Sequence, residues 1–189
     1  KPKFALKHPN WKMGKKISVD SSTFANKVLE LFEAKILFKI PSSKIKIIIE
    51  SNSVVHSVIN FNNNISFQVL HKANMEIPIS NALNLKNKFL LQPESLNIKF
   101  FEPNLKKFPI VNLGYEILNK LGQSGMIYFT VINQRLVESY LKNEINYGEI
   151  SKILVKTFKN KSILKKSKSK INSYDDIIKT IAEAEEIKI

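Results

Sequence analysis

The hydrophobic pattern of the chain changes near Glu102, and this change limits the possible folds more than any other feature of the sequence. Before it, short runs of alternating, β-branched apolar residues are typical of strands. After it, Pro103 and Pro109 interrupt the chain, and apolar residues then recur at helical spacing. We therefore predict an α+β protein: a domain with a mixed β-sheet and flanking helices over residues 1–101, followed by a helical domain over residues 102–189.

The first part also contains a predicted helix. Residues 1–14 are expected to form a loop, and Ser21–Phe38 a helix whose N-terminus one of two serines can cap. The asparagines at 62–64 tolerate positive φ and predict a hairpin turn. A short helix is expected within Met75–Asn87. The predicted strands are Lys44–Ile49, Val54–Phe61, Ile65–Leu70 and Asn97–Phe101.

Four helices are expected in the second part. They cover Ile110–Leu121, Ile127–Leu141, Tyr147–Phe158 and a segment that starts at Ser173. Gly122 is placed to end the first of them. Short helices with short connections predict a four-helix bundle. The lysine-rich segment 159–170 between the third and fourth helices is either a solvated linker or a basic binding site.

Composition removes several classes of chemistry. The chain of 189 residues has no cysteine and three histidines, which excludes disulfides, thiolate catalysis and cysteine-ligated zinc, and argues against a multi-histidine metal cluster. No apolar run reaches the roughly 20 residues of a membrane span, and residues 1–13 lack the apolar core of a signal peptide. We expect a cytoplasmic protein with no membrane partner, and a fragment of a longer one, because the chain begins at Lys1 without methionine.

The net charge of +14 first suggests a nucleic-acid partner. However, Arg135 is the single arginine among 30 basic residues, and arginine is the usual residue for bidentate phosphate and base contacts. Lysine, isoleucine and asparagine are abundant throughout, which indicates compositional bias. A basic, non-enzymatic nucleic-acid-binding module remains the alternative to an enzyme.

Polar residues at the start of the predicted helix offer a phosphate site. Ser21, Asn26 and Lys27 supply a hydroxyl, an amide and an ammonium group near free backbone amides. Glu30 follows Lys27 by three residues and Asn26 by four, so it shares their face. The residues alone leave a plainer interpretation open: an N-cap, exposed polar residues and a salt bridge between Lys27 and Glu30.

The loop before this helix carries a large aromatic residue. Trp11 lies between Pro9 and Gly14, and an exposed tryptophan in such a loop is unusual unless it covers something. The alternative is a tryptophan packed on a neighbouring surface.

Residues 8–34 read HPNWKMGKKISVDSSTFANKVLELFEA. This segment resembles the signature HPNWxMGxKISVDSATxxNKGLExxEA of the 1-deoxy-D-xylulose 5-phosphate reductoisomerase family. Weaker resemblance continues along the chain, where 101–104 and 108–109 resemble the family's F-x-x-P-D and R-F-P. It implies an enzyme that rearranges a phosphorylated ketose held by Mg²⁺ or Mn²⁺ and reduces it with NADPH to 2-C-methyl-D-erythritol 4-phosphate, an isoprenoid precursor. It also implies a homodimer, with residues 54–70 at the interface.

The resemblance implies a role for each matching residue. Ser21, Asn26 and Lys27 would hold the substrate phosphate, and Glu30 would bind the metal, with Glu33 supporting it from outside the ligand set. Residues 1–16 would form a lid that excludes water. The remaining implied contacts are His8, Trp11 and His56 to the substrate, and Met13 and Met75 to the nicotinamide side. For His56 and Met75, a structural histidine and a core methionine are the plainer alternatives.

The chain departs from the family at Val28, where the family has glycine, at Ser22, where it has alanine, and at 50–53, where Glu-Ser-Asn-Ser replaces His-Pro-Gln-Ser. The family's dinucleotide-binding domain and an upstream Asp-Ser-Glu segment with further metal ligands have no counterpart here. We therefore expect the isolated chain to be inactive. A catalytically dead dimerisation partner is a third possibility.

Overall fold

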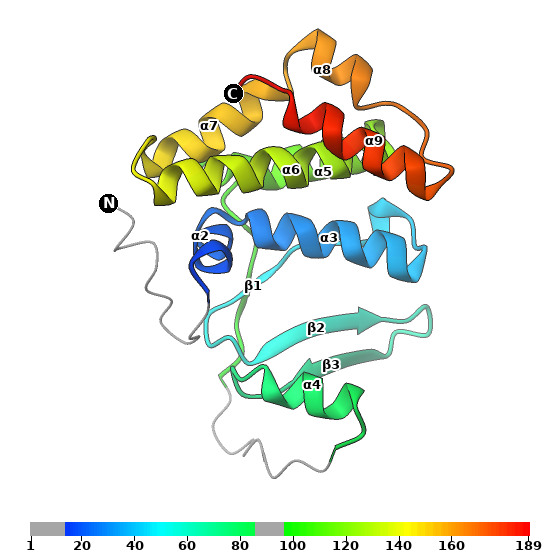
Figure 1. The fold of residues 1–189 in the computed structure, drawn as a ribbon. Helices are drawn as coiled ribbons and strands as arrows, with labels where there is room; N and C mark the ends of the chain where they lie inside the picture. The colour runs from blue at the N-terminus through cyan, green and yellow to red at the C-terminus, as the bar shows by residue number, and fades with distance from the viewer. Residues whose placement is uncertain (1–13, 86–96) are drawn as a thin grey trace. The chain divides into compact units, whose positions relative to one another are not determined.

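The computed structural model describes residues 14–85 and 97–189 (Figure 1). They form two compact units. Residues 14–47 and 103–189 make up the helical unit, and residues 48–85 and 97–102 make up the strand unit; each is described by itself. Among the described residues, no helix is long and apolar enough to cross a membrane. The predicted α+β class is confirmed.

Two helices replace the single helix predicted over Ser21–Phe38. Helix α2 covers Lys15–Thr23 and helix α3 covers Ala25–Phe38, and between them Phe24 adopts a left-handed φ of 67°. The predicted start at Ser21 was wrong because the buried side of α2 is largely polar. Its buried residues are Ser18, Val19, Asp20 and Thr23. Apolar periodicity therefore could not indicate this helix.

The helical unit has more helices than the predicted bundle. Helices α2 and α3 pack with the C-terminal helices, and α6 contacts α5, α7 and α9 (Figure 1). The predicted linker holds a further short helix, which Asn160 caps by accepting the backbone N–H of Ser162. The four predicted helices are present, but the four-helix bundle is not confirmed. The C-terminal helices are α5 (Pro109–Lys120), α6 (Gly122–Leu141), α7 (Tyr147–Thr157), α8 (Lys161–Lys166) and α9 (Tyr174–Glu185).

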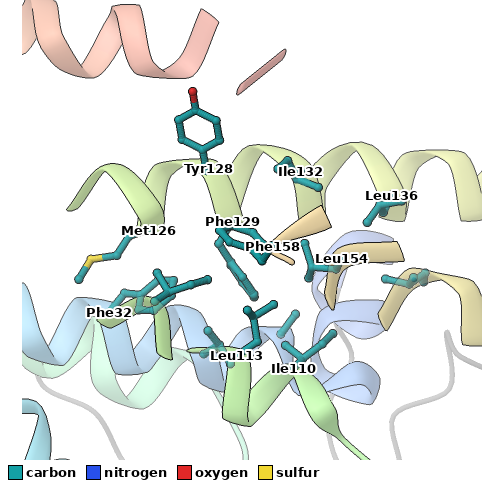
Figure 2. Packing of buried hydrophobic residues seen from close by; sticks show 14 of the residues in the cluster. Phe32, Ile110, Leu113, Met126, Tyr128, Phe129, Ile132, Leu136, Leu154 and Phe158 are labelled. Carbon is teal, nitrogen blue, oxygen red and sulfur yellow. The ribbon is translucent and has the colours of Figure 1, made fainter. Parts of the chain in front are cut away.

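The core of the helical unit is apolar and is formed by residues of α2, α3, α5, α6, α7 and α9, part of which Figure 2 shows. Phe129 lies near its centre: its ring meets Phe32 edge to face at a centroid distance of 5.4 Å and lies 6.5 Å from Phe158. Tyr128 points the other way, toward α9 (Figure 2), where its hydroxyl donates to Glu183 Oε2 over 3.1 Å. Residues from both ends of the chain thus form one core.

Two glycines allow close packing in this unit. A Cβ on Gly114 would lie 2.7 Å from Cγ1 of Val28, so α3 and α5 can approach only because α5 has no side chain there. Val28 is fully buried and occupies that space. Gly122 has φ of 64° and follows the end of α5, as predicted, and α6 begins at this residue.

The strand unit is built from two antiparallel pairs. Strands β2 (Val55–Asn60) and β3 (Ser66–Leu70) form the predicted hairpin, and Asn64 has φ of 63° in its turn. Strand β1 (Ile49–Glu50) pairs with β4 (Phe100–Phe101). Helix α4 (Glu76–Ala82) is the expected short helix. In the described residues these pairs are separate, so the predicted mixed sheet was wrong.

The strand predicted over Lys44–Ile49 was also wrong. A 3₁₀ helix, η1, covers Ser42–Lys44, and Ile49 alone of the predicted residues is in a strand. Ile45 and Ile47 instead pack against the helical core. The Ile47 backbone N–H donates to the Tyr115 hydroxyl over 2.9 Å, so it makes no ladder bond.

Candidate active site

The first turns of α3 bring three of the predicted site residues into contact. Asn26 Nδ2 donates to Glu30 Oε1 over 2.7 Å, and Lys27 Nζ donates to Glu30 Oε2 over 2.6 Å. This confirms that the three side chains share one face, as their spacing predicts. We call Asn26, Lys27 and Glu30 the α3 cluster.

The start of α3 is suited to an anion. Its first turn contains no acidic residue, and no side chain caps it. The positive end of a helix dipole with uncapped amides attracts phosphate. The backbone N–H of Ala25 makes only a 3.4 Å contact to Thr23 Oγ1. The α3 cluster therefore places an amide and an ammonium group beside this end of the helix.

Ser21 belongs to a different element from the α3 cluster. It lies in the last turn of α2, so its predicted place at a helix start was wrong. Its carbonyl accepts the backbone N–H of Phe24 over 3.2 Å, a bond that ends α2 and turns the chain into α3. Ser21 is half-buried. Four residues, with the turn at Phe24 among them, separate Ser21 from Asn26 of the α3 cluster.

The ion pair between Lys27 and Glu30 can be replaced by contacts with ligands. Lys27 and Glu30 are nearly half exposed, with side-chain exposures of 47% and 46%. Exposed ion pairs of this kind contribute roughly 0–1 kcal/mol. A cation at Glu30 and an anion at Lys27 could therefore replace the pair at little cost. Glu33 lies nearly one turn further along α3 and is exposed.

Asp20 is a residue whose importance the sequence analysis missed. It is 1% exposed, and its carboxylate accepts from Lys16 Nζ over 2.5 Å and from Asn133 Nδ2 over 2.8 Å. Asn133 lies on α6 and is fully buried. This bond fixes α2 on α6, next to Ser21. No local pattern indicates this bond, because Asn133 lies 113 positions away, although a buried aspartate requires a partner.

A second contact holds the same end of α2. The Tyr147 hydroxyl, from the first turn of α7, donates to the Ser22 carbonyl over 2.8 Å. Helices α6 and α7 therefore both anchor the segment that precedes the α3 cluster. The C-terminal helices position the candidate site even though none of the predicted site residues lies on them.

The other predicted site residues belong to the strand unit or lie outside the described residues. His56 lies on β2, where its ring stacks on His71 at a centroid distance of 3.5 Å and its Nε2 lies 3.0 Å from the His71 carbonyl. Met75 precedes α4 and is exposed. Both belong to the strand unit. His8, Trp11 and Met13, with most of the predicted lid, lie outside the described residues.

The turn after β1 is organised by Glu50, which the sequence analysis treated only as a departure from the family. Partial burial raises the pKa of its carboxyl, but backbone N–H groups of the following turn outweigh this and hold the pKa below its usual value. Asn52 N and Val54 N donate to it over 2.7 and 2.9 Å. The Glu50 carboxylate thus holds the backbone of this turn in place.

The described residues contain no group of three His, Asp or Glu side chains that could hold a metal ion. Glu30 fits as one ligand, because Mg²⁺ is often bound through one or two carboxylates together with water and substrate oxygens. The donor set present is therefore compatible with part of a magnesium site.

Comparisons with known proteins point to one family. A family model described as the DXP reductoisomerase C-terminal domain matches residues 70–187, and a 1-deoxy-D-xylulose 5-phosphate reductoisomerase C-terminal domain model matches residues 1–38. The 1-deoxy-D-xylulose 5-phosphate reductoisomerase of Pelagibacter ubique is 37% identical over 93% of this chain and 46% of its own length. That of Clostridium novyi is 39% identical over 86% of this chain and 44% of its own length.

Solved structures are also similar. A DOX-P reductoisomerase in complex with NADPH, fosmidomycin and magnesium superposes with a TM-score of 0.88 at 30% identity, over 97% of this chain and 47% of that one. The Zymomonas mobilis enzyme in complex with NADPH gives 0.78 at 29% identity, over the same shares. The chain thus spans about half the length of the relatives it matches.

The fold and these matches define the C-terminal region of a reductoisomerase. The family-model match covers more than half of the residues. The chain belongs to the 1-deoxy-D-xylulose 5-phosphate reductoisomerase family.

Proposed function

We propose that this chain contributes the phosphate-binding part of an enzyme that converts 1-deoxy-D-xylulose 5-phosphate into 2-C-methyl-D-erythritol 4-phosphate. The observation that carries the proposal is the convergence of Asn26 and Lys27 on Glu30 at the uncapped start of α3. The names of the relatives support the reaction. The structures with NADPH and magnesium support the cofactors.

Each residue has a proposed task. Ser21, Asn26 and Lys27 bind the substrate phosphate, with the α3 dipole adding to the attraction. Phosphate binding turns Lys27 away from Glu30 and leaves that carboxylate available to a divalent cation. Mg²⁺ or Mn²⁺ supplies charge stabilisation for the substrate oxygens in the rearrangement. Glu33 supports the site from the next turn.

Residues outside the helical unit have proposed positions around the substrate. The segment 1–16, with His8 and Trp11, covers the substrate and excludes water. Met13 and Met75 border the nicotinamide of NADPH. His56 orients the substrate from the hairpin. We also retain the division into a catalytic part over residues 1–101 and a helical part over residues 102–189, and a cytoplasmic location, as proposals.

The exposed face of the hairpin supports a homodimer. Apolar side chains on β2 and β3 and in the turn between them remain open to solvent in the isolated chain, and apolar patches of this kind mark interaction sites. A second copy that pairs along residues 54–70 would cover them. The nucleic-acid-binding alternative has no support from the Pelagibacter ubique and Clostridium novyi relatives, which are named as reductoisomerases.

The test is to supply the missing half of the enzyme. The chain alone should show no substrate-dependent NADPH oxidation. Fusion to the part of the Pelagibacter ubique relative that this chain does not match should restore it. In the fusion, Glu30→Gln should lower kcat by more than about 100-fold, whereas Glu33→Gln should lower it by less than about tenfold. Turnover by the isolated chain, or equal effects of the two substitutions, would refute the proposal.

A further inference from the structure

A hollow in the helical unit is separate from the α3 cluster. It lies between the end of α2, the segment that leads into α5, and α7, and its volume is about 780 Å³. Small-molecule sites typically occupy roughly 300–1,000 Å³. Neither Asn26, Lys27 nor Glu30 lines it. The side chains that give it its character are Lys106, Lys107, Lys152, Lys156 and Lys159; we call it the lysine pocket.

The charge around this hollow is unbalanced. Five of its thirteen lining residues are lysine, against 29 of 189 in the whole chain, so compositional bias alone does not account for it. None of the lining residues is acidic, and within the described residues none of these lysines is in a salt bridge. Lys152 and Lys156 are four residues apart on α7, where like charges destabilise a helix. An anion would relieve this repulsion.

The start of α5 strengthens the attraction for an anion. Phe108 and Pro109, at the N-terminus of this 12-residue helix, line the hollow. The first turn of α5 has no acidic residue and no side-chain cap, so its dipole is not neutralised. The turn before it is fixed by Asn104, whose Oδ1 accepts the backbone N–H groups of Lys106 and Lys107 over 3.1 and 3.0 Å.

The pocket also has an apolar side. Phe108, Pro109 and Val155 line it together with the lysines. The Phe108 ring is held against Phe24, with centroids 4.2 Å apart, and Lys107 Nζ lies 5.4 Å from its centroid. A ligand that fits this lining carries both negative charge and an apolar body.

We propose that the lysine pocket binds an organic diphosphate. Its two phosphate groups meet the lysines of α7 and the N-terminus of α5, and its apolar body lies against Phe108 and Val155. The lysines come from two separate elements, the segment before α5 and α7 with the residues that follow it, which suits a ligand with more than one phosphate group. A small molecule is favoured over nucleic acid because the lysines surround a hollow of ligand size. The site does not depend on the proposed function of the α3 cluster.

The experiment measures binding of octyl diphosphate to the 189-residue chain by isothermal titration calorimetry at physiological salt. We expect saturable one-to-one binding, and at least tenfold weaker binding of both octyl phosphate and inorganic diphosphate. The triple variant Lys152→Gln, Lys156→Gln, Lys159→Gln should bind octyl diphosphate at least tenfold more weakly. The matched control Lys165→Gln, Lys166→Gln, Lys168→Gln removes the same charge elsewhere and should bind within twofold of the unmodified chain.

Three outcomes would overturn the proposal: no saturable binding, equal losses in the two triple variants, or equal affinity for inorganic diphosphate and octyl diphosphate. Tighter binding of a decamer RNA at the same three lysines would also overturn it, in favour of nucleic acid. All five lysines are exposed, so melting temperatures should stay within about 2 °C. If the triple variant does not fold, Lys152→Gln and Lys156→Gln are measured singly, and each should weaken binding at least threefold.

Discussion

The helical unit and the strand unit differ in where their apolar side chains lie. Apart from Ile77, every buried apolar residue of the described chain belongs to the helical unit. In the strand unit, apolar side chains of the hairpin remain 46–60% exposed: Ile59, Phe61, Ile65, Phe67 and Val69. The helical unit has a buried apolar core, whereas the strand unit has an exposed apolar surface and, among the described residues, one buried apolar side chain.

This difference shows that the two units obtain their stability in different ways. A two-stranded hairpin is marginally stable by itself, and large exposed apolar patches mark interaction sites. The helical unit, by contrast, encloses Phe129 and its neighbours in a buried apolar core (Figure 2). We therefore expect substitutions in the helical unit to change the free energy of unfolding, and substitutions on the hairpin to change association.

The largest expected effect comes from the centre of the core. Phe129→Ala should reduce the free energy of unfolding by about 3–5 kcal/mol, because it leaves a cavity among rings that pack closely. Phe67→Ala on the hairpin, which is 60% exposed, should cost less than about 1 kcal/mol. Urea unfolding of the two variants checks the difference. Losses of similar size would show that the hairpin has a core of its own.

The next effect concerns the buried carboxylate on α2. Asp20→Ala leaves Asn133 Nδ2 without its acceptor and should cost about 2–3 kcal/mol. The control Asp175→Ala removes an exposed aspartate from the first turn of α9 and should cost about 0.3–1 kcal/mol. Thermal unfolding of both variants measures the two losses of stability. A loss at position 20 no greater than the loss at 175 would mean that the bond to α6 contributes nothing.

A third prediction concerns high pH. Burial, followed by the bond to Glu183, raises the pKa of Tyr128 to about 12. A raised pKa favours the folded state while the hydroxyl is protonated, so this stabilisation is complete below pH 10 and is lost between pH 10 and 12. The loss should be up to about 2 kcal/mol. Urea unfolding across this range should show that the free energy of unfolding of Tyr128→Phe depends less on pH than that of the unmodified chain. Equal slopes for the two proteins would contradict a raised Tyr128 pKa.

The smallest effect tests the close approach of α3 and α5. Gly114→Ala should cost about 1–2 kcal/mol, because its Cβ would lie 2.7 Å from Val28 Cγ1. In a Val28→Ala background the same substitution should stabilise the protein by about 0.5–1 kcal/mol, since alanine is then the better helix former. Urea unfolding of the two single variants and the double variant gives the coupling free energy between positions 28 and 114. Simple additivity of the two substitutions would show that the side chains do not meet.

The sequence predicts some elements well for physical reasons that these residues illustrate. The hairpin follows from asparagines that tolerate positive φ, and Asn64 adopts it. The contact of Lys27 with Glu30 follows from helix spacing alone. Helix α5 ends as predicted because Gly122 can take a left-handed conformation.

Other elements depend on contacts that local pattern does not contain. Helix α2 buries polar residues whose partner, Asn133, is 113 positions away. Ile45 and Ile47 have a strand-like sequence but pack on the helical core. The lysine pocket joins segments near residues 22, 107 and 152, so no single stretch of sequence indicates it. Long-range packing decides all three cases.

The α3 cluster is the proposed phosphate site, and the proposed function depends on it. The most direct measurement compares KM for 1-deoxy-D-xylulose 5-phosphate and for unphosphorylated 1-deoxy-D-xylulose, using the fusion enzyme with and without Lys27→Gln. We predict that Lys27→Gln reduces the preference for the phosphorylated sugar by at least about tenfold, since a charge-assisted bond to phosphate is lost. A preference that Lys27→Gln leaves unchanged would contradict it.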